Sequence, residues 1–169
     1  MKRIINKVLC ALLALVFLGC DHIDNKALPN YQVRINLGTY ALWSTYGVSG
    51  VGDYVIFNRE RHLPSNFPYN ANTYTGFGGV ILIMGLDSST GSYAPLAFDA
   101  SCPVESRSDV MLSVSSQNFE AVCPQCGSHY NLLTGAGGPV SGTATDRKVG
   151  LRAYKVHASV NGGYIITNY

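Results

Sequence analysis

The chain has 169 residues, of which 12 are Lys or Arg and 10 are Asp or Glu, a formal net charge of +2. Removing Lys2, Arg3 and Lys7 with an exported leader leaves nine basic and ten acidic residues, a formal charge of −1. This balance favours neither a nucleic acid nor an anionic membrane surface as a partner. The length suits one domain, since a chain of about 150 residues buries roughly 68–70% of its unfolded surface.

The N-terminus predicts export and a lipid anchor. The apolar run Val8–Leu18 has about eleven residues, fewer than the roughly 20 that a membrane-spanning helix needs. It ends at Gly19-Cys20, and a small residue followed by cysteine at this place resembles the lipobox of bacterial lipoproteins. The resemblance implies a signal peptide at 1–19, lipid on Cys20, and attachment to a membrane of the bacterial cell envelope, on the periplasmic side or at the cell surface. The alternative is an ordinary secretory signal in which Cys20 is incidental.

The rest of the chain predicts an all-β domain at 31–169, after a short polar tether at 20–30. Segments rich in Val, Ile, Tyr and Leu, separated by Gly, Pro, Asn and Ser, predict strands at 32–37, 54–58, 80–85, 96–99, 110–113, 120–122, 130–133, 151–156 and 164–167. The last two form a predicted hairpin through Asn161-Gly162-Gly163. No sustained helical period follows the leader, so a sandwich or small barrel is indicated.

One long segment, residues 59–78, has no strand pattern. It contains two prolines, and its aromatic residues are Phe67, Tyr69, Tyr74 and Phe77. Loops of this length are usually functional or disordered, and the favoured interpretation is an ordered insertion packed by its own aromatic side chains.

Three central cysteines carry the strongest chemical signal. Cys102 lies in AFDASCPVE, and Cys123 and Cys126 lie in AVCPQCGSHYNLLTGAGGPVSG. The second segment resembles the second cluster-binding loop of Rieske proteins, C-P-C-H-G-S-x-Y followed by a Gly/Pro-rich loop, and the resemblance extends over about 79–167. In that family a cysteine and a histidine from each of two loops hold a [2Fe–2S] cluster, with both histidines on one iron.

The resemblance implies a Rieske-like antiparallel β-sandwich with a small cluster-binding subdomain at about 95–142. Cys102 and Cys123 match the two cysteine ligands of the family. Ser128 matches the serine that bonds a bridging sulfide, and Tyr130 matches the tyrosine that bonds a cysteine ligand.

Both histidine positions are substituted. Cys126 stands at the second-loop histidine, and Val104 stands at the first-loop histidine. A fourth ligand for a cluster would have to come from Glu105 or His129, and alternation along a strand places His129 on the face opposite to Ser128 and Tyr130. We therefore expect no ordinary Rieske cluster.

Three further outcomes are open for the cysteines. Zinc could be held by the three thiolates with Glu105 or water, since a C-x-x-C pair is common in zinc knuckles. In an oxidising compartment, Cys102 could instead form a disulfide with Cys123 or Cys126, and a redox-active Cys123–Cys126 pair is the remaining case.

The sequence thus predicts a lipid-anchored envelope protein with a Rieske-type domain, which by family analogy transfers electrons to a redox or envelope partner. The alternative is a clusterless structural or binding module with loops held by a disulfide or by zinc. The sequence carries no Ser-His-Asp signature, phosphate loop or dinucleotide fingerprint, so no catalytic residue and no enzymatic activity are assigned.

Overall fold

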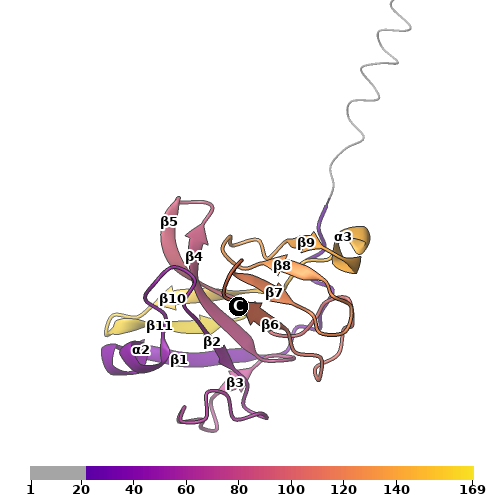
Figure 1. Ribbon diagram of the computed structural model, residues 1–169. Helices are drawn as coiled ribbons and strands as arrows, with labels where there is room; N and C mark the ends of the chain where they lie inside the picture. Colours follow the sequence, from indigo (N-terminus) through magenta and orange to yellow (C-terminus); the bar gives the residue numbers. More distant parts are fainter. Residues whose placement is uncertain (1–21) are drawn as a thin grey trace, which may run out of the picture.

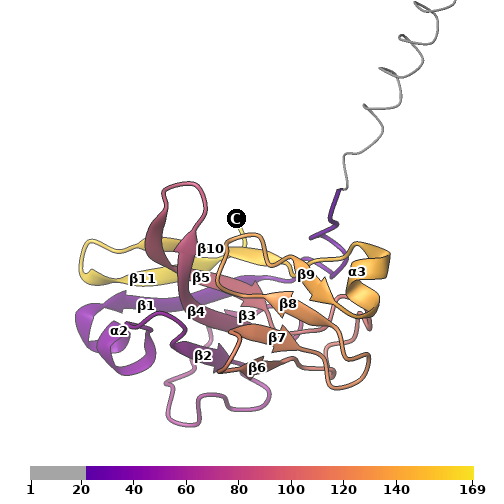
Figure 2. The same ribbon diagram turned by 45° about the horizontal axis from the view of Figure 1, so that its top comes forward.

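The computed structural model describes residues 22–169, which fold into two antiparallel sheets and two short helices (Figures 1 and 2). The leader and Cys20 lie outside the described residues. The large sheet has the order β2-β4-β5-β10-β11-β1-β3 and curls toward a barrel, whereas the small sheet has the order β6-β7-β8-β9. The all-β prediction is confirmed.

The bounds of the elements are as follows. The large sheet comprises β1 (Val33–Thr39), β2 (Tyr54–Phe57), β3 (Tyr74–Thr75), β4 (Val80–Asp87), β5 (Ser92–Asp99), β10 (Ala153–Ala158) and β11 (Gly162–Thr167). The small sheet comprises β6 (Ser113–Ser115), β7 (Glu120–Val122), β8 (His129–Asn131) and β9 (Pro139–Ser141). The helices are α2 (Tyr40–Tyr46) and α3 (Thr143–Arg147).

Strand β4 is buried on both faces, and this explains its uninterrupted run of Val80, Ile81, Leu82 and Ile83. Successive side chains of a strand point to opposite faces. Val80 and Leu82 accordingly belong to the cluster enclosed by the large sheet, whereas Ile81 and Ile83 belong to a second cluster under the small sheet. The small sheet is therefore attached to the large sheet through β4.

The predicted C-terminal hairpin is present. Strands β10 and β11 pair antiparallel from Lys155 opposite Thr167 to Ala158 opposite Tyr164, and Gly162, the first residue of β11, has φ of +84°. Glycine adopts this left-handed conformation without the strain that a Cβ would introduce.

The insertion at 59–78 is ordered by its aromatic residues, as the sequence suggested. The ring of Phe67 makes edge contacts with Tyr46, Phe57 and Tyr69, at centroid distances of 5.1, 5.1 and 4.8 Å. Strand β3 also lies within the insertion and pairs with β1, a pairing that two residues are too few to reveal in the sequence.

The segment predicted as a tether contacts the folded domain within its described part. Leu28 is only 2% exposed, and the Arg152 side chain donates a hydrogen bond from Nε to its carbonyl oxygen at 3.1 Å. Asp24 also forms a β-bridge with Val149.

Candidate metal centre

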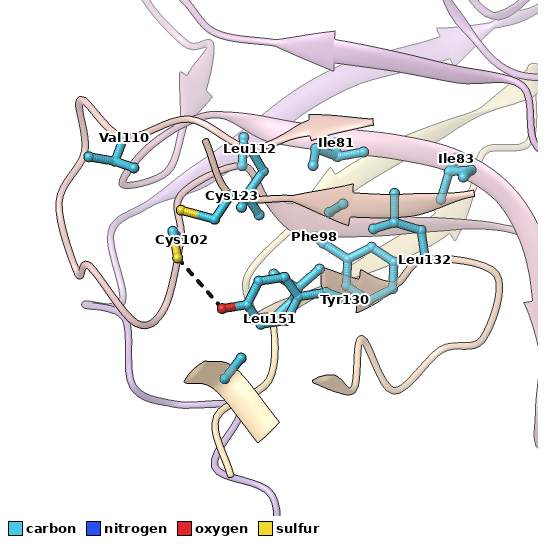
Figure 3. Packing of buried hydrophobic residues seen from close by; sticks show 13 residues of the cluster. Ile81, Ile83, Phe98, Cys102, Val110, Leu112, Cys123, Tyr130, Leu132 and Leu151 are labelled. Atoms are coloured by element: carbon cyan, nitrogen blue, oxygen red, sulfur yellow. Dashed lines mark hydrogen bonds between the residues drawn. The ribbon is translucent and has the colours of Figure 1, made fainter. Parts of the chain in front are cut away.

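Two loops of different sheets bring the three cysteines together. The first cysteine loop, Cys102–Ser106, follows β5, and the second, Cys123–Gly127, connects β7 to β8. The three Sγ atoms lie within 4.8 Å of one another, and those of Cys102 and Cys126 are 3.7 Å apart. Figure 3 shows Cys102 and Cys123 at the edge of the cluster under the small sheet.

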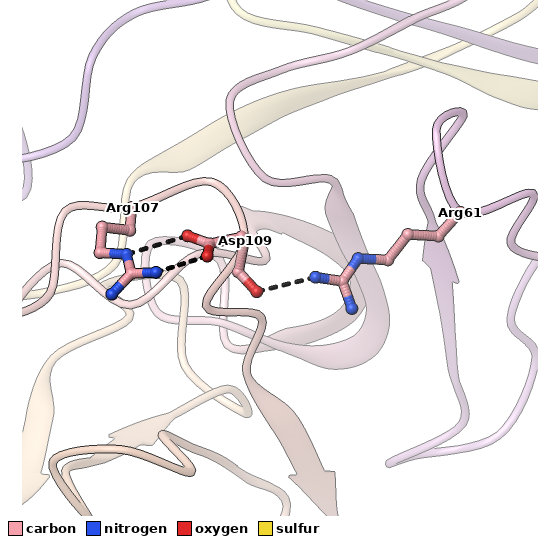
Figure 4. Close-up of polar contacts among 3 residues, drawn as sticks. All are labelled: Arg61, Arg107 and Asp109. Atoms are coloured by element: carbon pink, nitrogen blue, oxygen red, sulfur yellow. Dashed lines mark hydrogen bonds and ion pairs between the residues drawn. The ribbon is translucent and has the colours of Figure 1, made fainter.

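Hydrogen bonds hold the start of the first cysteine loop and the segment that follows it. The N–H of Cys102 donates to the carbonyl of Val110 at 3.2 Å, next to a β-bridge between Ser101 and Met111. Farther along, the Arg61 side chain donates to the backbone carbonyl of Asp109 at 2.7 Å (Figure 4). The carboxylate of Asp109 pairs with Arg107, but both side chains are more than half exposed, and such pairs contribute at most about 1 kcal/mol.

The two residues predicted to support the cysteines do contact them. The Tyr130 hydroxyl lies 3.6 Å from the Cys102 sulfur, drawn as the dashed line in Figure 3. The hydroxyl oxygen of Ser128 lies 3.1 Å from the Cys126 sulfur and accepts a hydrogen bond of 3.0 Å from the N–H of Ala144 in α3. Tyr130 and Ser128 are both fully buried, so their positions are fixed by packing.

The surroundings shift the pKa values of Cys102 and Cys126 in opposite directions. Burial raises the pKa of Cys102 to about 12, although the backbone N–H groups of Glu105 and Val104 and the Tyr130 hydroxyl favour its thiolate. At Cys126 burial also opposes ionisation, but hydrogen bonds from Ser128 and from the other two cysteines outweigh it and lower the pKa. Burial, followed by the neighbouring cysteine sulfurs, raises the pKa of Tyr130, so its hydroxyl keeps its proton as a donor.

Neither His129 nor Val104 brings a side-chain ligand atom to the sulfurs. The Nδ1 of His129 lies 2.8 Å from Oε2 of Glu120, in the register that pairs β7 with β8. Val104 packs its side chain against the buried cluster and offers only a backbone carbonyl, which accepts from Arg147 at 3.3 Å. Within residues 22–169, the group of potential ligand atoms contains the three sulfurs and no imidazole or carboxylate.

One pair of sulfurs, those of Cys102 and Cys126, has the spacing of two ligands on a single tetrahedral ion. With zinc–sulfur distances of about 2.3 Å, tetrahedral geometry places two thiolates about 3.8 Å apart. The Cys102–Cys126 distance of 3.7 Å matches this value.

None of the three cysteines forms a disulfide in the described part of the chain. The Cys102–Cys126 separation is well beyond the bond length of about 2.05 Å. The three thiols form a group that could hold a metal ion.

The sequence did not reveal how Ser128 is held. Its partner, the N–H of Ala144, belongs to a five-residue helix that has no apolar period. A signal was nevertheless present in Gly142, whose φ of +78° permits a close approach: a Cβ there would lie 2.9 Å from the Cα of Ser128.

No protein-family model matches the chain, and a search of curated proteins finds no significant match. Among the residues that the structure describes, no helix combines the length and the apolar character needed to cross a membrane. Fold and site together define an all-β protein with a cluster of three cysteines that could bind a metal.

Proposed function

We propose that this protein is a zinc-binding β domain of the bacterial envelope, in which one ion held by Cys102, Cys123 and Cys126 fixes the two cysteine loops together. The observation that carries the proposal is the convergence of the three sulfurs within 4.8 Å, with one pair at the edge length of a zinc–thiolate tetrahedron. Three protein ligands with buried supporting hydrogen bonds are typical of a built site rather than of an accidental contact.

The same proposal assigns a Rieske-like fold to the domain and a lipid anchor to Cys20. The fold assignment is supported by the meeting of the two loops and by the contacts of Ser128 and Tyr130 with cysteines. The anchor is supported by Gly19-Cys20 after the apolar run. Transfer of electrons through a two-iron cluster has no supporting observation in the sulfur geometry.

Metal analysis of the purified protein tests the proposal. The chain beginning at residue 20, with Cys20→Ser in place of the anchor, is purified without added metal and analysed for zinc, iron and acid-labile sulfide. We expect one zinc per chain without sulfide, and loss of the zinc from Cys102→Ser, Cys123→Ser and Cys126→Ser.

Two results would overturn it. Two irons and two sulfides per chain, with a Rieske-like signal in the reduced state, would establish the electron-transfer alternative. A metal-free protein with fewer than three titratable thiols would establish the disulfide alternative.

A further inference from the structure

The two cysteine loops share a turn that is closed in the same way. Each begins with Cys-Pro, and each is closed by a hydrogen bond from the fifth N–H to the first carbonyl: Ser106 to Cys102 at 2.9 Å, and Gly127 to Cys123 at 3.1 Å. The fifth residue is left-handed in both, with φ of +52° at Ser106 and +63° at Gly127. The second loop is a Cys-Pro-x-Cys-Gly turn, so the first repeats the geometry of a zinc knuckle.

The left-handed conformation of Ser106 indicates that the surrounding structure holds the first loop in the same turn as the second. Gly127 adopts a positive φ without penalty, and a Cβ there would meet nothing within 4 Å. A serine in the same conformation is strained by about 1–2 kcal/mol, and such strain persists where the surroundings determine the backbone. The loop thus keeps the knuckle shape against the local preference of its sequence.

Matching conformations make Glu105 the counterpart of Cys126. Cys126 is the fourth residue of its loop, and its sulfur turns back toward that of Cys123. Glu105 is the fourth residue of the first loop, and its backbone N–H points to the Cys102 sulfur. We propose that Glu105 provides the fourth ligand of the metal ion, so that each loop donates two ligands and the site is Cys3Glu.

This inference rests on the proposed zinc site and extends it. The other side chains near the loops are already engaged: His129 with Glu120, Asp109 with Arg107, and Asp99 with the Tyr154 hydroxyl. Glu105 is partly exposed, and its carboxylate lies outside the sulfur group in this structure. We expect rotation of its side chain to complete the tetrahedron, with a carboxylate oxygen at about 2.0–2.2 Å from zinc.

Variants of Glu105 test this assignment in the chain beginning at residue 20 with Cys20→Ser. Zinc affinity is measured by competition with a chelator, and cobalt(II) replaces zinc as a spectroscopic probe of the ligand set. Glu105→Gln, of the same size, should weaken zinc binding at least about tenfold, the lower end of what even outer partners of a metal site contribute. Glu105→Cys should tighten binding and strengthen the sulfur-to-cobalt charge-transfer band.

The control is Glu60→Gln, at an exposed glutamate outside the cysteine loops, which should leave affinity and spectrum unchanged. Wild-type affinity and an unaltered cobalt spectrum in Glu105→Gln would overturn the assignment and leave water as the fourth ligand, while the three-cysteine site would stand. If the unsubstituted chain took up neither zinc nor cobalt, the assignment and the proposed function would both fall.

Discussion

Tyr130 connects the hydrophobic cluster to the metal site, because its ring is buried and its hydroxyl lies 3.6 Å from the Cys102 sulfur. A hydrogen bond to a charged group contributes about 1.5–3 kcal/mol. Tyr130→Phe keeps the ring and removes only that donor, so we expect zinc affinity to fall about 10–100-fold in a chelator competition. An unchanged affinity would show that the hydroxyl does not support the thiolate.

Tyr154 provides the matched control in the large sheet. It lies in β10 and its hydroxyl donates to Oδ2 of Asp99 at 2.5 Å, where the carboxylate is fully buried. Tyr154→Phe should lower the free energy of unfolding of the metal-free protein by about 1–3 kcal/mol, since a buried acceptor loses its partner. Urea unfolding measures this loss. Zinc affinity should fall less than in Tyr130→Phe, because Tyr154 contacts no cysteine and reaches the first cysteine loop only through Asp99, which also accepts from the N–H of Ser101 at 2.8 Å. A large loss of affinity here would mean that the two clusters are coupled.

The acidity of the cysteines predicts how metal binding depends on pH. With its pKa raised to about 12 by burial, the Cys102 thiol is protonated at neutral pH, and zinc must displace that proton. The apparent affinity should therefore rise with pH by about tenfold per unit for each proton released, and fall on acidification. Titration calorimetry in buffers of different ionisation enthalpy counts the protons. A binding constant independent of pH would contradict thiolate coordination.

At the scale of the elements, the turn between β9 and α3 depends on Gly142. Its φ is +78°, and a Cβ would lie 2.9 Å from the Cα of Ser128. Gly142→Ala should therefore add a steric conflict to the backbone strain of about 1–3 kcal/mol, and displace Ser128 from Cys126. Gly91→Ala is the control, because φ there is +68° and nothing lies within 4 Å of the added Cβ. Thermal unfolding should show the larger loss at Gly142, together with weaker zinc binding. Equal losses would refute this explanation.

The elements that were predictable from the sequence are those whose side chains repeat a pattern. The run of Val80 to Ile83 marks β4 because both of its faces are buried, and the glycines after Asn161 mark the final hairpin. Helix α2 was missed because it has seven residues, none of them buried, and is capped by the Thr39 side chain, which accepts from the N–H of Leu42 at 3.2 Å. Its Leu42, Trp43 and Tyr46 are partly buried against the cluster of the large sheet, but a helix of two turns is too short for their spacing to stand out as a 3.6-residue apolar period.

The family resemblance predicted that the three cysteines lie close together, but their spacing along the sequence alone could not predict this. Cys102 and Cys123 are brought together by the packing of the small sheet on β4, a long-range contact that no local pattern encodes. The left-handed Ser106 was equally invisible, because serine gives no signal of a positive φ.

At the scale of the whole molecule, metal should stabilise the fold. Zinc binds the native loops, so free zinc at 1,000 times its dissociation constant should add about 4 kcal/mol and raise Tm by about 8–16 °C for a chain of this size. Differential scanning calorimetry with zinc, and with a chelator in excess, measures the shift. The Cys126→Ser variant should show little of it. A chelator without effect on wild type would count against the site.

Anchoring can be tested on the complete chain. If Cys20 carries lipid, Cys20→Ser should release the protein from membranes or leave its leader uncut. Membrane fractionation measures the release, and mass spectrometry of the N-terminus shows whether the leader has been cut. A mature N-terminus at another residue, without acyl mass, would contradict the anchor.

The two-sided burial of β4 has a consequence for amide hydrogen exchange. Its amides can exchange only when the packing on both faces is lost, so we expect them to report global unfolding. Strands β7 and β8 have three residues each and rest on one cluster, so they can open locally. Zinc bound to the cysteines would suppress the local opening of β7 and β8 more than the global unfolding that exposes β4. Zinc should therefore slow deuterium uptake most at β7 and β8, making the small sheet the part of the molecule that senses the ion.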